Sequence, residues 1–117
     1  MKQFNRQTGK KAEALAVAVL REKGYKILEQ NWGNKFGEID IIAQDGKTLV
    51  FVEVKAKTGT NLGTPEEMVG QGKLGKVQQM AMRYLEGKDV PCRIDVVAVV
   101  LEASGELERL THYENVY

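Results

Sequence analysis

"GEIDIIAQDGKTLVFVEVKAKTG", residues 37–59, is the segment from which the architecture can be predicted. Apolar residues alternate with polar ones on both sides of Asp45-Gly46, a dipeptide typical of tight β-hairpin turns. The side expected to be buried carries Ile39, Ile41, Val50, Val52 and Val54. The opposite side carries Glu38, Asp40, Glu53, Lys55 and Lys57. The pattern predicts a hairpin with one face in the core and an unusual concentration of charge on the other.

The register of this hairpin decides which charges meet. A two-residue loop at Asp45 and Gly46, or a four-residue loop around them, places Glu38 opposite Glu53 and Asp40 diagonal to Glu53. Like charges opposed across a strand pair are destabilising, whereas Mg²⁺ is bound by one or two carboxylates. The ammonium group of Lys55, on the same side, could orient a water or stabilise charge on a phosphate. Two interpretations remain: a metal site for phosphodiester hydrolysis, or an ordinary solvated face.

The segments before the hairpin predict one helix and one strand. Thr8 as N-cap and Gly24 as C-terminal stop predict a helix over about residues 9–23. A strand is expected over 25–32. Its inward-packing residues are predicted to be Tyr25, Ile27 and Trp32.

The segments after the hairpin complete a mixed α/β pattern. Residues 58–72 are rich in Gly and Thr and fit either a binding loop or a connector. A second helix is expected over 73–85, ended by Gly87, followed by strands over 92–102 and 107–113. This order of elements predicts an α/β fold, a mixed sheet with helices on its faces.

Length and composition fit one globular domain spanning residues 1–117, with 43% hydrophobic and 28% charged residues. The formal net charge is only +1, so an anionic partner would have to be held by local basic patches. No apolar run approaches the roughly 18 residues of a membrane span, and no membrane partner is expected.

Cys92 is the single cysteine, which excludes an intramolecular disulfide and a cysteine-based zinc site. A reducing, cytoplasmic location is the simplest expectation. The neighbours of Cys92 predict the start of a buried strand, and hence a structural thiol rather than a nucleophile.

The hairpin sequence resembles the catalytic core of the PD-(D/E)xK nuclease superfamily, which has the restriction-endonuclease-like fold. From "GKKAEALAVAVLREKGY" to "PCRIDVVAV", the chain resembles the YraN-like family of small bacterial proteins, predicted endonucleases similar to archaeal Holliday-junction resolvases. The specific feature is an ordered set: a helix with an early Glu, then G-E-I-D, V-E-V-K, a basic helix and R-I-D-V-V. Ile39 stands before Asp40, in place of the proline in the superfamily's name.

This resemblance implies a role for each site residue. Asp40 and Glu53 would bind Mg²⁺ (or Mn²⁺), with the backbone carbonyl of Val54 as a further ligand. Lys55 would be the lysine of the motif, and Glu13 the helical acid that completes the catalytic site.

The resemblance also implies a function. It predicts a restriction-endonuclease-like domain that binds nucleic acid, with DNA the expected substrate, and hydrolyses phosphodiester bonds, with branched or structured DNA as one candidate. Resolvase-like relatives are commonly dimers, which suggests a homodimer. The alternative is a catalytically silent nucleic-acid-binding or protein-interaction module that retains the fold.

Further charged residues have two interpretations each. The candidate nucleic-acid contacts, which could equally be solvated surface charges, are Lys57, Lys73, Lys76 and Arg83. Asp95 interrupts an apolar strand and is expected either to pair with Arg93 or to support the catalytic site. His112 is expected to be a packed or surface residue rather than a catalytic base.

Overall fold

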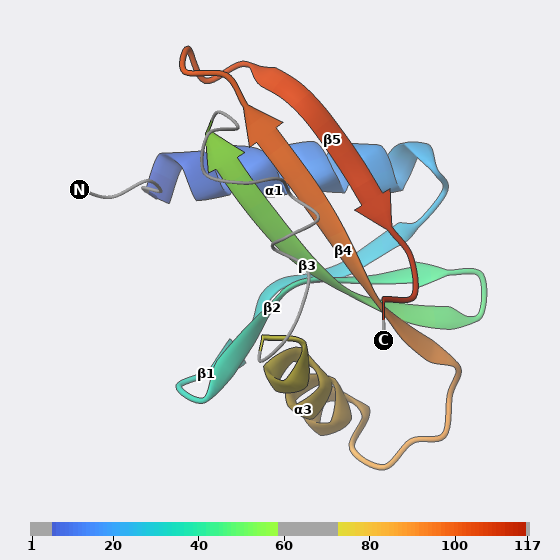
Figure 1. Cartoon of the computed structure of the whole chain (residues 1–117). Helices are drawn as coiled ribbons and strands as arrows, with labels where there is room; N and C mark the ends of the chain where they lie inside the picture. The colour runs from blue at the N-terminus through green and yellow to red at the C-terminus, as the bar shows by residue number, and fades with distance from the viewer. Residues whose placement is uncertain (1–5, 59–72, 117) are drawn as a thin grey trace.

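The structure, a computed structural model, describes the backbone of residues 6–58 and 73–116 and the side chains of 9–58 and 75–116 (Figure 1). Within these residues, five strands form one sheet in the order β1-β2-β3-β4-β5. The strands are β1 (Lys26–Asn34), β2 (Gly37–Asp45), β3 (Thr48–Thr58), β4 (Cys92–Leu101) and β5 (Leu107–Tyr113). Strands β3 and β4 are parallel and the other neighbours are antiparallel. The predicted mixed α/β fold is confirmed.

Two helices of the described chain pack against the sheet and build two separate cores (Figure 1). Helix α1 (Arg6–Glu22) buries Leu20 completely in the first core. Helix α3 (Lys73–Leu85) buries Met80 in the second core, where it joins Phe51 of β3. Because successive side chains of a strand point to opposite faces, β3 contributes to both cores and is covered on both faces.

The C-terminal ends of the two helices were predicted better than the N-terminus of the first helix. Gly24 and Gly87, both at positive φ (92° and 82°), follow the two helices as expected for C-terminal glycines. The second helix has its predicted bounds of 73–85. The first begins at Arg6, so Thr8 lies inside the helix and the N-cap prediction is wrong.

Strand β1 contains a β-bulge and contributes to both cores. The pairing of β1 with β2 shifts between Ile27 and Glu29. Tyr25 and Ile27 belong to the α1 core, whereas Trp32 and its β2 partner Ile39 pack in the α3 core. All three predicted residues of this strand pack inward, but in two different cores.

The β2–β3 hairpin has a different register from the predicted one. Asp45 pairs with Thr48, so the loop consists of Gly46 and Lys47. Gly46 has a φ of 62°, as a Gly-first two-residue turn requires. The pairing is shifted by two residues, and the predicted opposition of Glu38 to Glu53 is wrong.

Strands β2 and β3 separate directly beyond the pair of Ile41 with Val52. Strand β2 stays paired with β1 as far as Gly37, and this β1–β2 hairpin projects from the rest of the sheet (Figure 1). Ile41 packs in the α1 core but Ile39 in the α3 core, so the prediction that they share a face is wrong. Asp40 lies between them, where β2 turns away from β3.

Candidate active site

Asp40 fills the fork between the separating strands. Its Oδ2 atom accepts a hydrogen bond of 2.7 Å from the backbone N–H of Val54, which lies beyond the last β2–β3 pair. Burial raises the pKa of Asp40 to about 7, and the negative charge of Glu53 adds to the increase despite the Val54 bond. At neutral pH this carboxyl group is therefore close to its titration midpoint.

Glu53 and Lys55 form an ion pair on the neighbouring strand. The Lys55 Nζ lies 3.0 Å from Oε2 of Glu53, and the two side chains are only 9% and 15% exposed. Both residues are on the same side of β3, because they are two positions apart. A lysine this well buried is uncommon, and its ammonium group stands directly beside Glu53.

Glu13 adds an acid from helix α1. Burial raises its pKa, a hydrogen bond with the side chain of Asn31 lowers it, and the charges of Glu38 and Glu53 raise it further. Asn31 has a φ of 53°, in the left-handed region where asparagine is enriched. The sequence analysis missed Asn31. An asparagine within a predicted strand, where this residue is depleted, was the signal that could have indicated it.

We call the group formed by these residues the acid cluster, and it consists of Glu13, Glu38, Asp40 and Glu53. Its members come from helix α1 and strands β2 and β3. The hairpin pattern had grouped Glu38, Asp40 and Glu53, whereas Glu13 was assigned to the site only by resemblance. Each of the two raised pKa values has burial as its main cause and the charges of other cluster members as further causes. The acids outnumber Lys55, so the cluster favours binding of a proton or a cation.

The acid cluster offers oxygen donors, the ligands that a hard metal ion requires. Among the described residues, no three side chains of His, Cys, Asp or Glu are arranged to hold a metal. Mg²⁺, however, usually takes one or two carboxylates and completes its shell with water and substrate phosphate. Asp40, Glu53 and a backbone carbonyl at Val54 are all oxygen donors, and they fit this open type of site in number and chemistry.

The predicted nucleic-acid contacts lie in different environments. Lys76 and Arg83 are exposed on α3 and, seven residues apart, share one face of that helix. Lys57 is half-buried on β3, two positions beyond Lys55. The side chain of Lys73 lies outside the described residues.

Asp95 belongs to a different set of contacts. It is completely buried on β4 and accepts bonds from Arg93 Nε (3.1 Å), His112 Nε2 (2.8 Å) and the Asn115 N–H (2.9 Å). Pairing with Arg93 is confirmed, as is the packed character of His112, whose ring meets that of Tyr25 edge-on at 5.9 Å. We call this group the Asp95 network.

Two further sequence predictions can be compared with the structure. Cys92 begins β4 as expected, but it is exposed, so the predicted buried thiol is wrong. Burial on this strand begins only at Ile94. None of the helices in the described part of the chain is long and apolar enough to cross a membrane.

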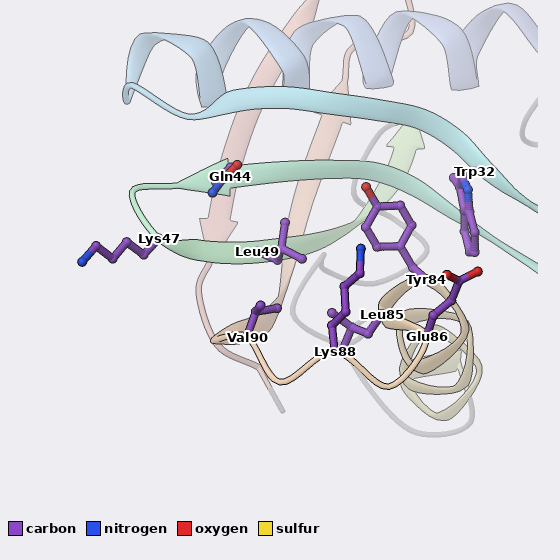
Figure 2. Close-up of a pocket in the computed structure, with 9 residues that line it drawn as sticks. All are labelled: Trp32, Gln44, Lys47, Leu49, Tyr84, Leu85, Glu86, Lys88 and Val90. Carbon is purple, nitrogen blue, oxygen red and sulfur yellow. The ribbon is translucent and has the colours of Figure 1, made fainter.

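A cavity of about 500 Å³ lies beside the C-terminal half of α3 (Figure 2). Its lining includes Trp32, Lys47, Tyr84 and Lys88 but no member of the acid cluster. The acid cluster is thus not part of this cavity.

The fold and the acid cluster define an α/β protein with a charged site at a fork in its sheet. The model of the Uncharacterised protein family UPF0102 matches residues 12–99, and the chain belongs to this family, the YraN family. The matched region includes every member of the acid cluster.

Similar proteins cover nearly the same length. A UPF0102 protein of Syntrophus aciditrophicus is 47% identical over 104 residues, 86% of this chain and 82% of the relative. One of Pelotomaculum thermopropionicum is 38% identical over 93% of both chains. A third, of Geobacter metallireducens, is 38% identical over all of this chain and 97% of its own length. The family assignment thus extends over nearly the whole chain.

Proposed function

We propose that this protein is a metal-dependent endonuclease with a restriction-endonuclease-like active site in the acid cluster. The observation that carries the proposal is the environment of Asp40, whose pKa is raised to about 7 by burial and by neighbouring carboxylates, one of which, Glu53, pairs with the buried Lys55. Such a perturbed group beside a specific charge partner is typical of functional sites. A divalent cation would relieve the repulsion among the acids.

Each residue of the site has a distinct role in this proposal. A cation held by Asp40, Glu53 and the Val54 carbonyl would polarise the phosphate and lower the pKa of an attacking water. Asp40 must lose its proton to serve as a ligand, and its pKa of about 7 makes this accessible at neutral pH. Lys55 orients Glu53 through their 3.0 Å contact and brings positive charge to the phosphate.

Glu13 and four basic residues complete the proposed site. Asn31 holds Glu13 at the edge of the cluster through their hydrogen bond. Lys57, Lys73, Lys76 and Arg83 are proposed to contact phosphates away from the cut. The proposed substrate is DNA, and branched or structured DNA is included because of the resemblance to junction resolvases.

The second candidate is a nucleic-acid-binding or interaction module without catalysis. It is favoured by one observation: among the described residues, no three potential ligand side chains are arranged to hold a metal. Both candidates share the proposed contacts to phosphate. They differ in whether a bound substrate is cut when Mg²⁺ or Mn²⁺ is supplied.

A cleavage panel tests the first candidate. Linear, flapped and four-way DNA, with RNA of the same sequences, would be incubated with protein and either metal. We expect cleavage by the native protein and by Asp89→Asn, an exposed control on the loop after α3, but none by Asp40→Asn. Binding without cleavage under every condition would support the silent module instead.

Variants of Lys55 and Lys76 distinguish the chemical step from substrate binding. Lys55→Met should slow single-turnover cleavage by roughly a hundredfold or more, because its charge acts on the transition state. Lys76→Ala, a change on the exposed face of α3, should instead lower the salt slope of binding by about one unit and leave cleavage of bound DNA intact. Cleavage by Lys55→Met at the native rate would remove this residue from the mechanism.

A further inference from the structure

The tip of the β1–β2 hairpin exposes an aromatic ring with two cations beside it. The Phe36 side chain is 64% exposed, and its backbone N–H bonds to Oδ1 of Asn34 at 2.8 Å. Lys35 Nζ lies 5.4 Å and Arg83 Cζ 5.5 Å from the ring centroid. Neither cation pairs with a carboxylate of the described residues. A single exposed apolar residue is ordinary, but a ring with two unneutralised cations beside it is a surface suited to an anion that also has aromatic rings.

The tip rests on a rigid support. A Cβ atom on Gly33 would lie 2.2 Å from the carbonyl oxygen of Gly37, so the two strands of the hairpin touch here. A Cβ on Gly37 would lie 3.1 Å from Cγ of the buried Met80, which fixes the hairpin against α3. Trp32 and Tyr84 strengthen this contact, with ring centroids 5.1 Å apart and planes nearly perpendicular (Figure 2). Phe36 is therefore presented from a braced hairpin.

The exposed ring is close to the acid cluster along the chain. Strand β2 leads from Phe36 to Asp40 in four residues, about 13 Å of extended strand. This length corresponds to roughly four stacked nucleotides at about 3.4 Å each. Arg83 reaches the ring from α3, whose exposed Lys76 lies on the same helix face. A strand of nucleic acid can thus contact both places at once.

We propose that Phe36 is a stacking site for an unpaired base of the nucleic acid, and that Lys35 and Arg83 hold the adjoining phosphates. This inference rests on the proposed nucleic-acid function and specifies its substrate: a single-stranded segment within about four nucleotides of the cut. Stacking on an aromatic ring requires an accessible base face, which continuous duplex lacks. An apolar protein partner fits less well, because covering Phe36 would desolvate both cations without neutralising them.

Fluorescence of 2-aminopurine in an oligonucleotide tests the stacking directly. Phe36→Ala should weaken binding of single-stranded DNA by roughly 5- to 100-fold and abolish quenching of the probe base. Phe36→Trp should retain both affinity and quenching. Duplex affinity should change by less than about twofold, because phosphate contacts dominate it. Leu107→Ala, at an exposed apolar residue of β5, is the matched control.

The outcomes distinguish this inference from the proposed function. If Phe36→Ala binds single strands as the native chain does, the stacking site is refuted while nuclease activity can still be observed. If Phe36→Ala loses single-strand binding but the native protein cuts nothing with either metal, the stacking site stands and the nuclease proposal falls. If Phe36→Ala alters only self-association in sedimentation, the tip is a protein contact and the inference is wrong.

Discussion

Two aspartates flank the central strand β3 and have opposite electrostatic environments. Asp95 on β4 is completely buried, but bonds from His112, Asn115 and Arg93 outweigh the cost of burial and lower its pKa. Asp40 on β2 receives one backbone bond and has acidic neighbours, and its pKa rises to about 7. The same side chain is thus stabilised as an anion on one side of β3 and destabilised on the other.

This difference separates an acid that supports the fold from one for which we propose a function. Every polar contact of Asp95 supports its charge, as expected where a buried anion holds parts of the fold together. The acid cluster leaves Asp40 poorly compensated, and folding alone gives no reason for such a conflict. Local conflicts of this kind are expected at functional sites. The comparison therefore predicts that the two aspartates respond oppositely to neutralisation.

The largest change in the free energy of unfolding is expected for substitution of Asp95. Asp95→Asn keeps the shape of the side chain but leaves Arg93 without its buried counter-charge, which should lower the free energy of unfolding by about 3–5 kcal/mol at pH 7. The folded pKa of Asp95 is depressed, so its contribution is present above its unfolded pKa and lost as the pH falls through the folded value. Urea denaturation at a series of pH values checks both the loss of stability and its dependence on pH.

A loss of under about 1 kcal/mol would contradict the structural role assigned to the Asp95 network. Asp45→Asn is a suitable control, because Asp45 bonds the same Arg93 at 3.3 Å but its side chain is 45% exposed. Its effect should be well below that of Asp95→Asn.

Asp40→Asn should change the free energy of unfolding in the opposite direction from Asp95→Asn. The folded pKa of Asp40 is raised, so between about pH 4 and pH 7 the native state binds the extra proton and its stability falls as the pH increases. Removing the charge should stabilise the protein by about 2–4 kcal/mol at pH 8 and change little near pH 4. Thermal or urea unfolding without metal, with Asp89→Asn as control, measures this. A destabilised Asp40→Asn at pH 8 would show that the acid cluster is well compensated.

Local patterns in the sequence were sufficient to predict the helices and strands. They were also sufficient to predict which residues form the charged side of the β2–β3 hairpin. Alternation over residues 37–58 predicted strands, and the glycines at 24 and 87 predicted the helix ends. The bulge between Ile27 and Glu29 gave no such signal, because it adds one residue without a distinctive side chain. The change of core at Trp32, which it shares with its strand partner Ile39, was likewise not predicted.

The geometry of the candidate site depends on features that one sequence leaves open. Asp45-Gly46 and Gly46-Lys47 are both plausible loops, and the choice between them shifts the register by two residues. The fork at Asp40 arises because β2 follows β1 toward α3, which is a tertiary effect. The contribution of Glu13 came only from the family resemblance, because no spacing rule connects a residue of α1 with β3.

The smallest change in the free energy of unfolding is expected for Glu53→Gln, because the substitution has one stabilising and one destabilising consequence. The change relieves repulsion on Asp40, which is worth up to about 1 kcal/mol. It also removes the 3.0 Å ion-pair partner of Lys55, whose side chain is only 9% exposed. Removing one member of a fully buried ion pair costs several kcal/mol. Here the cost should be smaller, because without Glu53 the carboxyl group of Asp40 can ionise and supply part of the missing negative charge. We expect a net destabilisation of about 1 kcal/mol at pH 7.

A double-mutant cycle with Asp40→Asn separates the two consequences. With Asp40 already neutral, no nearby acid of β2 can replace Glu53, so Glu53→Gln should cost about 1 kcal/mol more than in the native background. Urea unfolding of the native chain, both single variants and the double variant gives this coupling. If Glu53→Gln stabilises the native chain instead, repulsion among the acids outweighs the Lys55 ion pair, and Lys55 owes its burial to other contacts.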